Sequence, residues 1–281
     1  MDRPAAIEEL IGNMLYSCIQ ERKREHEQYV PDHSMGCIIT GSVQFFTAAG
    51  TSTHGAGSMG LVKRDLLLKT TKIPPPGGEF RSISLHFSQH ALKEYAVTHH
   101  IAATKPYTGP GMHPLDGNPF IKGFFDSLLP WFDSRTPFSD TMLTIKTNEA
   151  IELLLQHDPE LQHLLFDFQE PYKVDLAAYM HRHFMFNVPL ERFARLTGRS
   201  LAAFKRDFGK DFGMAPGKWL QQRRLEEAHR LIQTEGRKPS DVYLDVGFEN
   251  LSHFSFAFKK QFGVTPARAG HYALSISQPK P

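Results

Sequence analysis

The chain has 281 residues, 41% of them hydrophobic, and its 32 basic and 30 acidic side chains leave a formal charge of only +2. This length favours two domains over one. No run approaches the roughly 18 consecutive apolar residues of a membrane-spanning helix, and residues 1–9 lack the apolar core of a signal peptide. We therefore expect a cytoplasmic protein that does not associate with membranes.

The cysteines and histidines form no metal-binding pattern. The two cysteines, Cys18 and Cys37, lie in no ligand motif, and the 15 histidines are scattered without HExxH spacing. We therefore expect reduced thiols, no metal and no cofactor. The sequence also has no Gly-rich phosphate loop, no Gly-x-Ser-x-Gly motif and no cysteine beside a motif histidine, so no catalytic site is predicted.

The first half of the chain is predicted to contain several short strands between residues 32 and 87. The predicted segments, in chain order, are two strands within residues 36–47, a turn-rich stretch at residues 48–55, a strand at residues 66–73 and a strand at residues 80–87. The last of these alternates, with Ile83, Leu85 and Phe87 on one face. Short strands separated by Gly and Pro favour a small barrel or jelly roll.

A helical region follows the strands. The predicted helices are residues 89–100, 119–132, 138–156 and 159–168. Residues 168–173, which include Pro171, are the predicted linker. The domains are accordingly expected at residues 1–168 and 172–281.

Charge divides the chain at the same linker. From Tyr172 to the end there are 18 basic and 10 acidic side chains, a net charge of +8, so the preceding stretch carries −6. A basic domain attracts phosphate through counterion release, whereas an acidic one repels it. Nucleic acid is therefore expected to meet only the C-terminal half.

The C-terminal half contains one segment twice, at residues 200–216 and residues 250–266. The shared residues are Leu201, Phe204, Phe208, Lys210, Phe212, Gly213 and Pro216 in the first copy, and Leu251, Phe254, Phe258, Lys260, Phe262, Gly263 and Pro266 in the second. Their apolar positions form one stripe of a helix, and Ser200 and Asn250 are suited to cap its N-terminus. A short apolar helix ending in glycine precedes each copy, at residues 190–198 and 240–247. Helix, tight turn and helix is the helix-turn-helix, whose second helix enters the DNA major groove.

A single helix, residues 218–233, is predicted to join the two units. Trp219, Leu220, Leu225 and Leu231 are among its apolar residues, and Gly236 follows it. Two reading helices that enter successive major grooves on one DNA face must lie roughly 34 Å apart. A stiff helix fixes that distance, whereas a flexible linker would not.

The chain resembles the AraC/XylS transcriptional regulators. The matching segments are residues 190–198, 224–231, 246–254 and 258–266, and the resemblance covers roughly residues 174–272. Tyr243 departs from it, because the family usually has a small residue there. The resemblance implies a cupin-like effector domain before the DNA-binding domain, although the metal-binding histidines of cupins are missing. It also implies that RNA polymerase is a partner, that an activator is favoured over a repressor, and that the helices after the barrel either mediate homodimerisation or pack onto the barrel.

The residues expected to contact DNA follow from the face opposite each phenylalanine stripe. Ala202, Lys205 and Arg206 match the positions of the first helix that usually touch bases in this family, and an arginine can bind guanine with two hydrogen bonds. Their counterparts in the second helix are Ser252, Ser255 and Phe256. Phe256 either contacts a thymine methyl group or is buried against the joining helix. The expected phosphate contacts are Lys210, Lys259, Lys260, Ser200 and Asn250.

The sequence thus predicts an α+β chain, with an N-terminal cupin-like β-barrel or jelly roll and its following helices, then an all-α domain of two helix-turn-helix units. The predicted function is a bacterial regulator that binds promoter double-stranded DNA in two successive major grooves. Its N-terminal domain is expected to respond to a small molecule, at residues that the sequence does not identify. Two alternatives stay open, namely control by a protein partner and a cupin enzyme fused to a DNA-binding domain.

Overall fold

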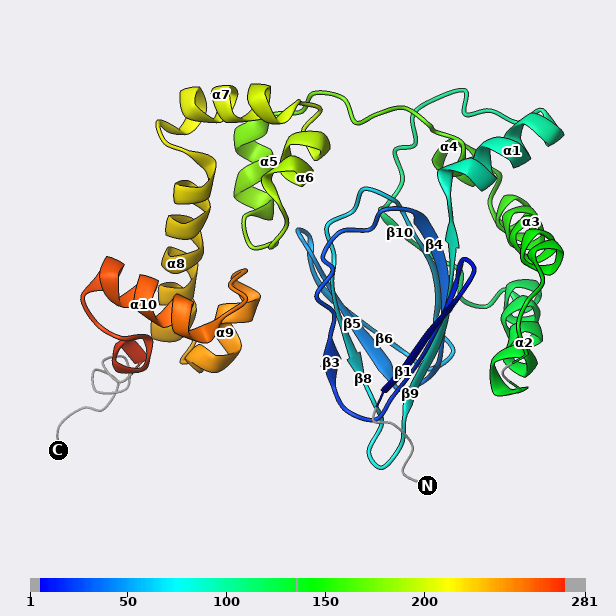
Figure 1. Ribbon diagram of the computed structural model, residues 1–281, viewed down its shortest axis with the longest axis horizontal. Coiled ribbons are helices and arrows are strands. Elements are labelled where there is room, and N and C mark those ends of the chain that lie inside the picture. The colour runs from blue at the N-terminus through cyan, green and yellow to red at the C-terminus, as the bar shows by residue number, and fades with distance from the viewer. Residues whose placement is uncertain (1–5, 135, 271–281) are drawn as a thin grey trace. The chain divides into compact units, whose positions relative to one another are not determined.

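The computed structural model of the chain describes residues 6–134 and 136–270, and it divides the chain into two units, residues 1–169 and 170–281 (Figure 1). The N-terminal unit contains all the strands of the described residues and the helices α1 to α4, and the C-terminal unit contains the helices α5 to α10. Each unit has its own architecture and is described by itself.

Two antiparallel sheets build the N-terminal unit. The strands are β1 (Ala6–Ile11), β2 (Met14–Ile19), β3 (Lys23–Arg24), β4 (His33–Thr40), β5 (Ser42–Thr47), β6 (Gly50–Gly55), β7 (Met59–Val62), β8 (Lys69–Ile73), β9 (Phe80–Phe87) and β10 (Met112–Pro114). The larger sheet has the order β1-β2-β9-β4-β7-β10, and the smaller one has the order β3-β8-β5-β6. The predicted fold class, a sheet-rich domain followed by an all-helical one, is confirmed.

The turn between β4 and β5 carries the chain from the larger sheet to the smaller one. Gly41 in this turn has φ +80°, and a Cβ atom there would lie 2.6 Å from the carbonyl oxygen of Ile73. Only glycine fits such a position without strain. The two strands predicted on either side of Gly41 and Ser42 are therefore confirmed. The close approach of the Ile73 carbonyl oxygen explains why the turn requires glycine.

The prediction for residues 48–55 was wrong, because residues 50–55 form β6 and pair with β5 in a hairpin. β6 is the edge strand of the smaller sheet and has the sequence GTSTHG. Because it contains no aliphatic or large apolar residue, neither of its faces shows an apolar pattern. The strand predicted at residues 66–73 begins only at Lys69. The hairpin of β1 and β2 lies before residue 32 and was missed. By contrast, the alternating strand at residues 80–87 is confirmed as β9, with Ile83, Leu85 and Phe87 fully buried.

Helices cover one face of the larger sheet. They are α1 (Gln89–His99), α2 (Pro119–Ser134), α3 (Asp140–His157), the 3-10 turn η1 (Pro159–Leu161) and α4 (Gln162–Leu165). One apolar cluster joins Met14, Met35 and Leu85 of the sheet to Phe124 of α2 and Ile151 of α3. The helices after the barrel therefore pack on it, as one of the two sequence-based alternatives held.

A polar cluster closes the C-terminal end of this unit. Arg64 is 8% exposed, and its Nη2 donates to the carbonyl oxygens of Asp167 at 2.8 Å and Gln169 at 3.0 Å. The backbone N–H of Arg64 donates to Nδ1 of the fully buried His33 at 3.2 Å. The last residues of the unit are thereby held by a side chain that follows β7.

His33 is expected to make the stability of this unit depend on pH. Burial, together with the charges of Arg64 and Lys63, lowers the pKa of His33 from 6.5 to about 3. As the pH falls below the higher value, the unfolded chain binds a proton that the folded chain does not bind. The free energy of unfolding should therefore decrease, by up to about 1.4 kcal/mol per pH unit from this group.

Urea unfolding of the full chain and of His33→Gln, repeated between about pH 7 and about pH 4, measures this contribution. The variant should lose stability less steeply as the pH falls, whatever its stability at neutral pH. Parallel curves for the two proteins would show that His33 is not the source of the dependence.

The C-terminal unit is all-helical. Its helices are α5 (Leu176–His183), α6 (Leu190–Leu196), α7 (Leu201–Phe212), α8 (Pro216–Thr234), α9 (Pro239–Asp245) and α10 (Leu251–Phe262). The sequence did not predict α5. Figure 1 shows α8 as the element that joins the group α5–α7 to the pair α9–α10, so the predicted joining helix is confirmed.

Candidate nucleic-acid interface

The two predicted helix-turn-helix units are present with their predicted caps. In the first unit, Gly198 turns the chain with φ +65°, and the Ser200 hydroxyl accepts the backbone N–H of Ala203 at the start of α7. In the second, Gly247 turns the chain with φ +97°, and the Asn250 side chain accepts the N–H groups of Ser252 and His253 at the start of α10. In each unit, a glycine with positive φ is thus followed by a polar N-cap residue at the start of the second helix.

The phenylalanine stripes face the interior of both units. Phe204 and Phe208 of α7 and Phe254 and Phe258 of α10 are fully buried. The ring of Trp219 from α8 lies 5.6 Å from that of Phe208, measured between centroids. These contacts fix the rotation of each reading helix about its own axis, so the opposite face is left to solvent.

The departure at Tyr243 is accommodated by packing. Its ring is half-buried and lies 6.4 Å from the ring of Phe254. Phe254 in turn packs against Phe248 and Phe258. The larger side chain thus packs against the core of the second unit.

The predicted reading residues lie on the exposed faces of α7 and α10. Those that are exposed are Ser200, Ala202, Lys205, Arg206, Lys210, Asn250, Ser252, Lys259 and Lys260, and Ser255 is partly exposed. Phe256 is 70% exposed, so it does not belong to the core. Of the two alternatives for this residue, burial against the joining helix is excluded in this structure.

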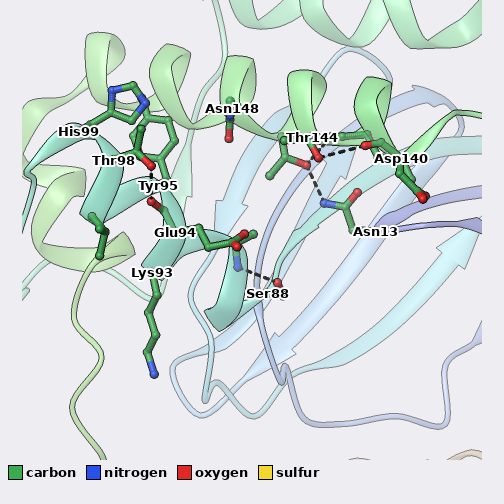
Figure 2. A pocket seen from close by; sticks show the side chains of 14 residues that line it. Asn13, Ser88, Lys93, Glu94, Tyr95, Thr98, His99, Asp140, Thr144 and Asn148 are labelled. Carbon is green, nitrogen blue, oxygen red and sulfur yellow. Dashed lines mark hydrogen bonds between the residues drawn. The ribbon is translucent and has the colours of Figure 1, made fainter.

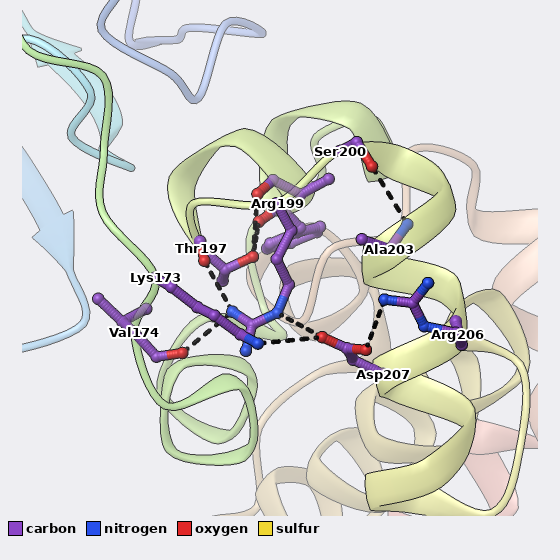
Figure 3. A network of polar contacts seen from close by, with 10 residues as sticks. Lys173, Val174, Thr197, Arg199, Ser200, Ala203, Arg206 and Asp207 are labelled. Carbon is purple, nitrogen blue, oxygen red and sulfur yellow. Dashed lines mark hydrogen bonds and ion pairs between the residues drawn. The ribbon is translucent and has the colours of Figure 1, made fainter.

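Arg206 stands beside a polar network at the first turn (Figure 3). Its Nη2 contacts the Asp207 carboxylate at 3.4 Å, while two-thirds of its side chain is exposed. The carboxylate is engaged more closely by Arg199, whose Nε lies at 3.2 Å, and the hydrogen bond from Arg199 lowers the pKa of Asp207. Arg206 thus keeps most of its donors available, because Asp207 is already neutralised by another arginine.

Arg199 also ties the segment before α5 to this turn. Its Nη1 donates to the carbonyl oxygens of Val174 at 3.0 Å and Thr197 at 2.7 Å. Lys173 adds an ion pair to Asp207 at 3.7 Å. Residues 173–174 are therefore anchored to the first helix-turn-helix, a long-range contact that no local pattern in the sequence could reveal.

A groove in the N-terminal unit lies between α1 and α3 (Figure 2). Asn13 from the turn after β1 donates to the Thr147 hydroxyl at 3.0 Å, and its own side-chain oxygen is buried without a partner among the described residues. Lys93, Glu94 and Asp140 contribute charges of both signs to the lining. This groove could not be predicted from the sequence, because its residues come from three separate segments.

Other kinds of site are not seen among the residues described. No group of three or more His, Cys, Asp or Glu side chains in residues 6–134 and 136–270 is arranged to bind a metal ion. Among the helices of the same residues, none has the length and hydropathy needed to cross a membrane.

Comparison with known families separates the chain into the same two parts. Residues 33–165 match the family described as the ExsA N-terminal regulatory domain, and residues 193–270 match the family described as a helix-turn-helix domain. The regulator ExsA of Pseudomonas aeruginosa is 26% identical over 163 residues, which are 57% of this chain and 58% of ExsA. The chain belongs to the AraC/XylS family.

Another curated relative matches a shorter stretch of the chain. The virulence regulon transcriptional activator VirF of Yersinia enterocolitica is 32% identical over 94 residues, which are 34% of this chain and 35% of VirF. The chain thus spans between about a third and three-fifths of the curated relatives it matches. Among solved structures, ToxT of Vibrio cholerae is 12% identical with a TM-score of 0.42, over 92% of this chain and 97% of ToxT.

Proposed function

We propose that this AraC/XylS member regulates transcription by placing α7 and α10 in two successive major grooves of promoter DNA. The observation that supports this most directly is the pair of helix-turn-helix units in which Phe204, Phe208, Phe254 and Phe258 are buried, while the lysines, arginine and small polar residues of the opposite face are exposed. The relatives are transcriptional regulators, which argues against an enzyme.

Within this proposal the exposed residues have two roles. Ala202, Lys205 and Arg206 of α7 read base edges, and Ser252, Ser255 and Phe256 of α10 read the second groove, with Phe256 against a thymine methyl group. The remaining exposed groups bind phosphates and set the register, namely Ser200, Asn250, Lys210, Lys259 and Lys260.

Salt dependence tests the proposal for the DNA-binding unit. The stretch from Tyr172 onward has 18 basic and 10 acidic side chains, so its binding should release counterions. About six phosphate contacts would give a slope near −5 in a plot of log affinity against log salt concentration. The full chain and a fragment beginning at Glu170 should both show it with a promoter duplex. A flat response from both would contradict the proposal.

Arg206 should carry part of the sequence specificity. In Arg206→Ala we expect binding to the cognate duplex to weaken by about 1–3 kcal/mol and the preference at one base pair to relax, since two hydrogen bonds to guanine are lost. The control is Lys260→Ala, which should weaken cognate and scrambled duplexes by similar factors and make the salt slope shallower by about one contact. If Arg206→Ala affects both duplexes equally, Arg206 binds phosphate instead.

The N-terminal unit is proposed to receive the controlling signal. The input is a small molecule or, as the alternative, a protein partner, and the groove between α1 and α3 is a concave surface open to either. By family resemblance we further propose an activator that works in the bacterial cytoplasm, contacts RNA polymerase and forms a homodimer. Mass spectrometry of the purified protein under native conditions separates a bound small molecule from a bound protein.

A further inference from the structure

One arginine of α8 bonds both to the segment that leads into the first helix-turn-helix unit and to the turn of the second unit. Arg224 donates from Nε to the carbonyl oxygen of Phe184 at 2.8 Å and from Nη2 to that of Phe186 at 2.8 Å, both in the segment between α5 and α6. Its Nη1 donates to the carbonyl oxygen of Gly247, in the turn of the second unit, at 3.0 Å. A single rigid guanidinium thus connects these two segments directly.

The position of Arg224 on α8 is the boundary between two apolar contacts. Before it, Trp219 packs on Phe208 and Phe212 of the first unit. After it, Leu225 and Ala228 belong to the apolar cluster of the second unit, together with Phe254 and others. On α8, Arg224 therefore lies between the residues that pack on the first helix-turn-helix unit and those that pack on the second.

Burial of the Arg224 guanidinium disfavours its charged form unless nearby polar groups compensate the charge. It lowers the pKa of Arg224 to about 10, so the guanidinium stays charged at neutral pH, compensated by the three carbonyl oxygens and by the charge of Glu249. A lysine carries the same charge but cannot reproduce the planar fork that reaches three acceptors at once. The geometry is thus specific to arginine.

The turn of the second unit is packed against the same segment. Gly247 has φ +97°, and a Cβ atom there would lie 2.7 Å from the carbonyl oxygen of Met185 and 2.9 Å from Nε of Arg224. Asn187 donates to the Glu249 carboxylate at 2.6 Å. These contacts of Gly247 and Asn187 lie next to Asn250, the N-cap of α10. They therefore fix the N-terminal end of α10, which is the end that would enter the major groove first.

The aromatic contacts described above fix the rotation of α7 and α10 within their own units, but they do not join α7 to α10 directly. α8 has 19 residues and spans about 28 Å, which sets a distance between the units but not the angle between their reading faces. Hydrogen bonds are directional and resist a change in this angle. One inserted base pair displaces a site by about 3.4 Å and turns it by about a tenth of a full turn, so the angle decides which spacing is accepted.

We propose that Arg224 is a positioning residue that sets the angle between α7 and α10, and with it the spacing of the two DNA sites. The effect on the spacing of the DNA sites rests on the proposed function, whereas the angle between α7 and α10 is a property of the protein alone. Two measurements on the full chain test these two claims separately.

The first measurement is the distance between spin labels on α7 and α10 in the free protein. Labels are attached at the equivalent exposed positions Asp211→Cys and Gln261→Cys, after Cys18 and Cys37 have been replaced by serine. Arg224→Gln should broaden the distance distribution while leaving the helical content unchanged. Arg230→Gln is the matched control, because Arg230 lies on the same helix and is half exposed, in ion pairs with Glu227 and Glu235; it should leave the distribution as it is. Equal distributions for Arg224→Gln and the control would overturn the proposal.

The second measurement uses a duplex selected by the wild-type protein in vitro, and the same duplex with one base pair inserted between the two sites. The wild type should prefer the selected duplex by about tenfold or more, and Arg224→Gln should reduce this preference to about twofold or less. An unchanged preference in the variant would refute the role in spacing. If the wild type binds no duplex selectively, the proposed function fails, while the label distances still decide the role of Arg224. Should Arg224→Gln fail to fold, Asn187→Ala is the substitute, with a smaller shift in the same direction expected and no shift counting against the proposal.

Discussion

Replacing Gly198 by alanine should lower the free energy of unfolding of the C-terminal unit by about 3 kcal/mol or more. The backbone of Gly198 has φ +65°, which costs a residue with a Cβ atom roughly 1–2 kcal/mol. The added Cβ would also lie 2.4 Å from the carbonyl carbon of Tyr172 and 2.5 Å from the backbone nitrogen of Lys173. This segment cannot simply move away, because Arg199 holds the neighbouring Val174 carbonyl.

The control for this prediction is Gly213→Ala. Gly213 follows α7 with nearly the same φ, +66°, but a Cβ atom there would meet nothing within 4 Å. Its replacement should therefore cost only the conformational part, about 1 kcal/mol. Urea unfolding followed by the fluorescence of Trp219, which packs against α7, measures both variants. Equal losses would mean that contact with residues 172–173 contributes nothing.

The largest effect of a single side chain is expected for Phe258→Ala. Phe258 is fully buried in the second unit, between Phe254 and Phe262, with centroid distances of 5.6 Å and 4.7 Å. Removing a ring from such a site leaves a cavity and typically costs about 3–5 kcal/mol. The C-terminal unit should accordingly unfold at much lower urea concentration, and DNA binding should be lost with it.

Phe256→Ala is the matched comparison on the same helix. Since Phe256 is 70% exposed, its removal should change the free energy of unfolding by no more than about 0.5 kcal/mol. Binding to a selected duplex should nevertheless weaken by about 1 kcal/mol if the ring covers a thymine methyl group. A duplex with uracil in place of that thymine should then bind the wild type and the variant alike. Loss of stability in Phe256→Ala would contradict its exposed position.

The helix-turn-helix units could be predicted from sequence because their signals are local and occur twice. The phenylalanine spacing in residues 200–216 reappears in residues 250–266, and the capping residues Ser200 and Asn250 mark where each reading helix begins. Burial of one helix face also determines which residues are exposed on the other. The exposed positions of Lys205, Arg206 and Lys260 followed from this argument, while their contacts with DNA stay a prediction.

The contacts that hold the units together could not be predicted in this way. Arg224 reaches carbonyl oxygens 38 and 40 residues earlier and 23 residues later in the chain, so no periodic pattern reports it. β6 was missed because a polar strand at a sheet edge buries no apolar face. The groove between α1 and α3 depends on Asn13, which lies in a hairpin that the sequence did not reveal.

The segment that joins the N-terminal unit to the C-terminal unit is anchored at both ends, so only a short stretch of main chain lies between the anchored residues. Arg64 holds the Gln169 carbonyl of the N-terminal unit, Arg199 holds the Val174 carbonyl of the C-terminal unit, and residues 172–173 lie close against Gly198. Between them the main chain has only Glu170 and Pro171, and the ring of Pro171 fixes its own φ. Reorientation of one unit against the other therefore has to be absorbed by a handful of torsion angles. Under the proposed function, a change in the N-terminal unit that is transmitted through this segment would act on α7 and α10 as rotation about a few main-chain bonds.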